Sequence, residues 1–110
     1  MAAMSDIQAV ADRIAEAFDA ERIVLFGSHA RGTATSDSDV DLLVILPFEG
    51  KPFWKSLEIT NRVDPAFPVD LLARRPGDTQ RRYARGDPLI REALDRGRVL
   101  YERSRARVDG

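Results

Sequence analysis

The sequence predicts a small α/β protein in which a mixed β-sheet of about three or more strands is flanked by helices. Short β-branched apolar runs alternate along the chain with segments whose apolar residues recur at helical spacing. The 110 residues suffice for a single modest hydrophobic core. The chain shows neither internal repeats nor linker-like composition. We therefore expect one domain over residues 1–110.

The first half of the chain is expected to form one helix and two strands. Apolar residues at helical spacing predict an amphipathic helix over residues 6–19, with Ser5 as its N-cap and Gln8 completing a capping box. Two short β-branched apolar runs, bounded by Gly27 and Pro47, are typical of buried strands. These runs are Ile23 to Phe26 and Val40 to Leu46.

The second half is expected to add three helices and a third strand. Pro52 is favourable as the first residue of a helix that continues to about Val63. The sequence FPVDLLA, residues 67–73, predicts a strand that is followed by a turn at RRPGD. Two further helices, interrupted by Gly-Asp-Pro, are expected over residues 79–85 and 88–96. The segment GRVLYE is expected to be extended and packed, and residues from about 103 to 110 to form a mobile tail.

Composition excludes several classes of protein. The chain has no cysteine, so neither a disulfide nor a thiolate metal site is possible. The N-terminus lacks the basic and apolar regions of a signal peptide, and no apolar run approaches the roughly 20 residues that span a bilayer. We therefore expect a cytoplasmic protein.

Charge is distributed unevenly along the chain. Residues 1–70 carry 12 acidic and 6 basic side chains, whereas residues 71–110 carry 6 acidic and 11 basic ones. This asymmetry indicates either an anionic ligand or partner for the C-terminal part, or a solvated arginine-rich helix surface.

A Gly27-Ser28 pair directly follows the first predicted strand. Glycine lets a phosphate approach the main chain closely, and the serine hydroxyl can add a hydrogen bond. The same pair also makes ordinary turns, and the Gly-Lys-Ser/Thr ending of a P-loop is absent.

Three aspartates accompany the second and third predicted strands. Asp39 and Asp41 are two residues apart and therefore project from the same face of their strand. Their carboxylates repel each other unless a cation such as Mg²⁺ neutralises them, the alternative being a solvated loop that caps the strand. Asp70 interrupts an apolar strand, where an unpaired carboxylate is costly. If the two strands are neighbours, Asp70 can join the other two in one acidic cluster; otherwise it is an exposed residue of an edge strand.

These residues together resemble the signature of the DNA polymerase beta-like nucleotidyltransferase superfamily, in which Gly-Ser is followed after ten residues by Asp-x-Asp. The string GSHARGTATSDSDVDLLV looks like the minimal nucleotidyltransferase branch, whose members are often called MNT proteins. The segments VDLL and RGRVLYE continue the likeness more weakly. The resemblance implies the polymerase beta-like nucleotidyltransferase fold.

The resemblance also implies a role for each residue of the signature. Asp39 and Asp41 would hold two Mg²⁺ ions that bind the nucleoside triphosphate. Asp70 would ligate the ion nearest the incoming hydroxyl and help to remove its proton. Gly27 and Ser28 would bind the β- and γ-phosphates of ATP, the expected donor.

Residues beside the signature are assigned less specifically. Arg31 could bind a phosphate of the nucleotide or pair with one of the neighbouring aspartates. His29, the only histidine, is expected at the surface. Phe53 and Trp54 are expected in the core beneath their helix rather than as a stacking platform for a base.

The resemblance implies a type VII-like antitoxin. Small MNT proteins commonly act beside a HEPN-domain toxin, typically a ribonuclease, which is silenced by nucleotidylation of a tyrosine. We therefore expect Mg²⁺-dependent transfer of AMP from ATP to a protein hydroxyl, with no membrane and no direct nucleic-acid substrate. Two alternatives stay open: an antitoxin that acts by binding alone, and transfer to a small molecule such as an aminoglycoside. The sequence does not indicate the oligomeric state.

Overall fold

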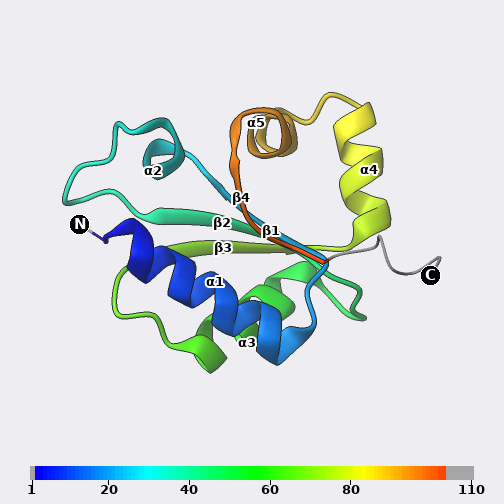
Figure 1. The fold of residues 1–110 in the computed structure, drawn as a ribbon. Helices are drawn as coiled ribbons and strands as arrows, with labels where there is room; N and C mark the ends of the chain where they lie inside the picture. The colour runs from blue at the N-terminus through cyan, green and yellow to red at the C-terminus, as the bar shows by residue number, and fades with distance from the viewer. Residues whose placement is uncertain (1, 104–110) are drawn as a thin grey trace, which may run out of the picture.

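The computed structural model describes residues 2–103, which form a four-stranded sheet with helices on both faces (Figure 1). The first five elements are α1 (Met4–Phe18), β1 (Arg22–Phe26), α2 (Ser28–Arg31), β2 (Val40–Ile45) and α3 (Pro52–Val63). The remaining four are β3 (Val69–Arg74), α4 (Pro76–Ala84), α5 (Pro88–Arg96) and β4 (Arg98–Glu102). Apart from Arg103, the tail that the sequence predicts to be mobile lies outside the described residues.

The sheet is mixed, as predicted, with the strand order β3-β2-β1-β4. β1 pairs antiparallel with both β2 and β4, whereas β2 and β3 run parallel. The predicted extended segment GRVLYE is therefore the edge strand β4. Because β2 and β3 are parallel neighbours, their first residues lie at the same end of the sheet, next to the last residue of β1.

Alternating side chains of the strands supply two hydrophobic cores, one on each face of the sheet. Helices α1 and α3 cover one face, and α4 and α5 cover the other (Figure 1). In β2, Leu42 and Val44 pack with the core on the α1 side, whereas Leu43 and Ile45 pack against Ile90 of α5. Odd-numbered positions of β2 therefore face α5, and so does the carboxylate-bearing position 41.

Helix α1 begins two residues earlier than predicted. It starts at Met4 with Ala3 as its N-cap and without a side-chain cap, so the prediction of Ser5 as a capping-box residue is wrong. The Gln8 amide donates instead to Asp12 Oδ1 and, at 2.9 Å, to the backbone carbonyl of Leu100 in β4. A tertiary contact to the edge strand has replaced the local cap.

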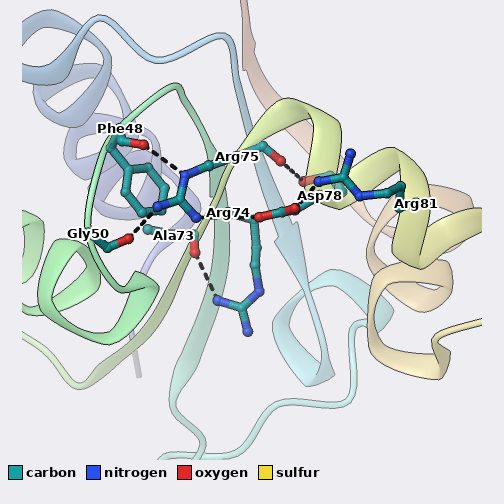
Figure 2. A network of polar contacts seen from close by, with 8 residues as sticks. Phe48, Gly50, Ala73, Arg74, Arg75, Asp78 and Arg81 are labelled. Atoms are coloured by element: carbon teal, nitrogen blue, oxygen red, sulfur yellow. Dashed lines mark hydrogen bonds and ion pairs between the residues drawn. The ribbon is translucent and has the colours of Figure 1, made fainter.

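Helix α4 shows a second difference from the prediction. The segment RRPGD is not a turn. Helix α4 begins at Pro76, so the last three residues of this segment form the first turn of the helix, which was predicted to begin only at residue 79. Arg75, just before the helix, fixes this junction to the loop after β2 (Figure 2). Its guanidinium donates to the carbonyls of Phe48 and Gly50, lies over the Phe48 ring and pairs with Asp78.

Helix α3 leaves its aromatic residues in solvent. Phe53 and Trp54 are 65% and 62% exposed, so their predicted place in the core is wrong. They form an edge-to-face pair, while Ile59 and Val63 supply the buried side of the helix. Among the described residues, no helix is long and apolar enough to cross a membrane.

Candidate active site

The two halves of the predicted signature meet at the end of the sheet where β1 stops and β2 begins. Phe26, the last residue of β1, is the register partner of Asp41 in β2. Gly27 follows in a left-handed conformation with φ of 76°. A Cβ atom at Gly27 would collide with Asp41 Oδ2, so any other residue here would force this carboxylate to turn away and would also strain the backbone. The glycine of one motif therefore leaves space for the aspartate of the other in its observed orientation.

The second and third aspartates lie beside each other on adjacent strands. Asp41 of β2 and Asp70 of β3 are register partners in the parallel ladder. Both project toward the face that carries α5, because Leu43 and Leu72, two residues further along, pack with the core on that side. Asp39 precedes β2 by one residue and is exposed, as is Asp70, whereas Asp41 is half-buried. The predicted convergence of β2 and β3 is thus present in the fold.

Burial and neighbouring charges both disfavour the ionised carboxyl of Asp41. Partial burial raises the pKa of its carboxyl above the usual 3.8, and the neighbouring charges of Asp70, Asp39 and Glu92 raise this pKa further. His29 opposes these effects. A bound cation would remove this repulsion, as expected for carboxylates that serve as metal ligands.

The loop between α2 and β2 is held by short-range hydrogen bonds. The backbone N–H of Thr35 donates to Ser38 Oγ at 2.9 Å, and the N–H of Ser38 returns a bond to the Thr35 carbonyl at 3.0 Å. His29 Nε2 donates to the Ser38 carbonyl at 3.3 Å, which ties α2 to the residue before Asp39. This histidine is half-buried and contacts the loop, rather than lying free at the surface.

Arg31 pairs with a residue that the sequence did not single out. Its Nη1 lies 2.6 Å from Oε2 of Glu92, which α5 presents to α2. The alternative prediction, a pair with a neighbouring aspartate, is not what the structure shows. Glu92 is a fourth carboxylate near Asp41, contributed by a helix some 50 residues away in sequence. No local motif marks it, because only the packing of α5 onto the sheet brings it to the site.

The donor chemistry fits a hard divalent cation. Every charged ligand candidate at the start of β2 and β3 is a carboxylate, and oxygen ligands are those that Mg²⁺ prefers. Within residues 2–103, no three His, Cys, Asp or Glu side chains are gathered closely enough to hold one ion by themselves. Oxygens of a bound triphosphate and water would therefore have to complete the coordination, which is usual for Mg²⁺.

Comparisons with known proteins find a matching domain family and similar folds. A family model for the nucleotidyltransferase domain matches residues 7–100. No curated protein matches the chain. A candidate nucleotidyltransferase from Sulfolobus solfataricus is 25% identical, with a TM-score of 0.57 and 70% of each chain covered.

Two further solved structures share the fold. They are a toxin-antitoxin with AMP-PNP, 18% identical, and the toxin-antitoxin MntA-HpeT mutant D39ED41E, 17% identical. Each has a TM-score of 0.58, with 90% of this chain and 76% of the other covered.

Proposed function

This chain belongs to the nucleotidyltransferase domain family, and we propose that it moves AMP from ATP to a hydroxyl group of a partner protein in an Mg²⁺-dependent reaction. The observation that carries the proposal is the contact between the two motifs. The Asp41 carboxylate occupies the space beside Gly27, while its register partner Asp70 brings a further carboxylate from β3. A phosphate-binding turn and a cation site thus share one sheet end.

Each site residue has a role in the proposed reaction. Asp39, Asp41 and Asp70 would hold the Mg²⁺ ions, which supply positive charge against the negative charge that develops at the α-phosphate. Gly27 and Ser28 would bind the β- and γ-phosphates and so orient pyrophosphate as the leaving group.

The proposed transfer is a single displacement at phosphorus. The acceptor oxygen forms a bond to the α-phosphorus, the bond to the bridging oxygen breaks, and pyrophosphate leaves with that bonding pair. Asp70, which is exposed at the start of β3, would accept the proton of the acceptor hydroxyl.

The proposed acceptor is a tyrosine of a HEPN-type toxin, which makes this chain an antitoxin. Two of the structures with the same fold are toxin-antitoxin proteins, and one of these contains AMP-PNP. Their likeness to this chain shows the fold alone, so the partner and the donor are parts of the proposal. The exposed position of Asp70 leaves the acceptor side of the site open to another macromolecule.

Intact-mass measurement tests this proposal. The chain is incubated with Mg²⁺, ATP and the product of the neighbouring gene as the candidate HEPN-type partner, and this partner is expected to gain one or more AMP units. The gain should vanish with EDTA and with the Asp39→Asn/Asp41→Asn variant. No gain with any of the four nucleoside triphosphates would contradict the proposal.

A toxicity assay with the same double variant separates catalysis from binding. If catalysis silences the toxin, the double variant should fail to protect cells even though it still forms the complex. Full protection by the double variant would show that the chain acts by contact alone. AMP transfer to an aminoglycoside, but not to the protein, would favour the small-molecule alternative.

A further inference from the structure

The Arg31–Glu92 pair connects the phosphate-binding turn to a helix that the nucleotidyltransferase signature does not include. Ser28 and Arg31 are the first and last residues of α2, three positions apart, and so lie on the same side of its single turn. Glu92 comes from the middle of α5, which is anchored to the sheet through buried Ile90 and Ala93. A mobile side chain of the turn is therefore attached to a rigid element.

The pair uses only one edge of the Arg31 guanidinium. Nη1 donates to Glu92 Oε2 at 2.6 Å, and the described residues provide no hydrogen-bond partner for Nε or Nη2. Nε and Nη2 together form the side edge of the guanidinium, whose two parallel N–H groups match the oxygens of a phosphate. The Arg31 side chain is 51% exposed, which makes the side chain accessible to a ligand.

We propose that Glu92 is a positioning residue for nucleotide binding: it holds Arg31 by Nη1 and thereby presents the Nε/Nη2 edge to a phosphate of the triphosphate. This inference rests on the proposed function, because it assumes that the triphosphate binds beside Ser28. An unrestrained arginine must lose its rotamer freedom when it binds a ligand, whereas a restrained one has lost much of it beforehand. Glu92 also lies within electrostatic reach of Asp41, which places it near the same ligand.

A second ion pair in the chain provides a matched control. Arg22 and Glu102 lie 2.7 Å apart on β1 and β4, with side chains 40% and 53% exposed, close to the 51% and 37% of Arg31 and Glu92. Arg22 begins β1, whereas the candidate site lies where β1 ends, so this pair is at the opposite end of the sheet. Glu102→Gln should therefore leave nucleotide binding unchanged.

The test measures the affinity for α,β-methylene-ATP with Mg²⁺ by calorimetry, together with the thermal midpoint of each variant. Glu92→Gln should weaken binding about three- to tenfold without lowering the midpoint by more than Glu102→Gln does. Arg31→Ala should weaken binding at least as much. In the Arg31→Ala background, Glu92→Gln should not weaken binding further, because Glu92 supports binding only through Arg31 and the loss of its negative charge cannot disfavour an anionic ligand.

Three results with the variants would overturn this inference alone. Tighter binding by Glu92→Gln would mean that the negative charge of Glu92 opposes the triphosphate more than it helps to position Arg31. Equal weakening in the Arg31→Ala background would mean that Glu92 supports binding without Arg31. Unchanged binding by Glu92→Gln would mean that the pair has no role in nucleotide binding. Failure of the wild-type chain to bind the analogue would reject the proposed function as well. Glu92-dependent binding without transfer to any protein would reject only the proposed acceptor.

Discussion

At the scale of single residues, the backbone of Gly27 and the carboxylate of Asp41 limit each other's conformation. The backbone at Gly27 combines φ of 76° with ψ of −154°, a region that side-chain-bearing residues avoid, and the space of its missing Cβ holds a carboxylate oxygen. The repulsion at Asp41 is the electrostatic counterpart of this crowding. Both features weaken the folded state, and both are explained if the site exists to bind a phosphate and a cation.

Substitution of Gly27 tests the steric part of this account. Gly32→Ala places a side chain at a similar φ of 78° with nothing within 4 Å, and should cost about 1–2 kcal/mol of unfolding free energy. Gly27→Ala should cost at least about 1 kcal/mol more, because its Cβ collides with Asp41 and because its ψ of −154°, unlike the 18° of Gly32, lies outside the left-handed helical region. Urea denaturation gives both values. In an Asp41→Ala background, the difference between the costs of Gly27→Ala and Gly32→Ala should become smaller. If this difference does not change, the collision with Asp41 does not contribute to it.

Substitution of Asp41 tests the electrostatic part. A carboxyl whose folded-state pKa is raised binds its proton more tightly in the folded than in the unfolded chain. Its contribution therefore makes the protein less stable as the pH rises from about 3.8 through the raised value. Asp41→Asn should accordingly raise the unfolding free energy at pH 7 by roughly 0.5–1 kcal/mol while abolishing AMP transfer. A less stable variant at pH 7 would show that the burial and repulsion of the Asp41 charge are not the dominant effects at this position.

At the scale of elements, α3 protects the outer edge of the sheet. β3 has a strand neighbour on one side only, and its Ala73 N–H points to Ser56 Oγ of α3 at 2.9 Å. The same hydroxyl donates to the Pro52 carbonyl at 2.8 Å. One serine thus connects helix and edge strand, and keeps β3 in register with β2, where Asp70 faces Asp41.

The Ser56 connection predicts a measurable loss of stability. Ser56→Ala leaves the Ala73 N–H without its partner in a buried position and should cost about 1–3 kcal/mol. Hydrogen exchange at the Ala73 amide should accelerate more than exchange at amides of β1. Ser56→Thr keeps the hydroxyl and is the control. An Ala73 amide that exchanges equally slowly in the alanine variant would show that this contact does not protect the edge.

Helix α5 depends on Asp87, its N-cap. The Asp87 carboxylate accepts from the N–H groups of Leu89 and Ile90 at 3.0 and 3.2 Å. The Ile90 N–H holds the pKa of Asp87 below its usual 3.8, with help from Arg82. A lowered pKa gives stability that is present above pH 3.8 and disappears as the pH falls through the lowered value.

The loss of stability at low pH tests the contribution of Asp87 as the N-cap of α5. Asp87→Asn retains a good capping group and should keep most of the thermal midpoint at pH 7, whereas Asp87→Ala should lower it by a few degrees. The asparagine variant should also lose less stability than the wild type between pH 5 and 3. Parallel acid curves for the two proteins would show that Asp87 does not contribute to acid unfolding.

At the scale of the whole molecule, local sequence patterns predicted the elements better than their contacts. The β-branched runs before Gly27 and Pro47 identified β1 and β2, because both strands are buried on both faces. The start of α4 was misjudged although Pro76 and Asp78 are good first-turn residues, since Pro-Gly-Asp also favours turns. Phe53 and Trp54 were misplaced because apolar residues at the start of a helix can face outward as well as inward.

The candidate site was predicted only as far as its sequence motif extends. The placement of Asp70 beside Asp41 followed from expecting two neighbouring strands, and the parallel pairing confirms it. Glu92 was missed because its position depends on how α5 packs on the sheet, which no local pattern encodes. The collision that a side chain at Gly27 would make with Asp41 likewise depends on a tertiary contact. The Gly-Ser motif indicated only that glycine is favoured at this position.

Electron paramagnetic resonance of Mn²⁺ tests the central claim most directly. Mn²⁺ is titrated into a mixture of the chain and α,β-methylene-ATP, and into the nucleotide alone. The difference between the two titrations gives the Mn²⁺ that is bound only when the chain is present. The wild-type chain should bind this additional Mn²⁺, Asp41→Asn and Asp70→Asn should each weaken binding at least about tenfold, and Asp64→Asn, beyond the end of α3, should have no effect. Undiminished binding in the Asp41→Asn or Asp70→Asn chain would contradict the claim that carboxylates from adjacent strands form the cation site.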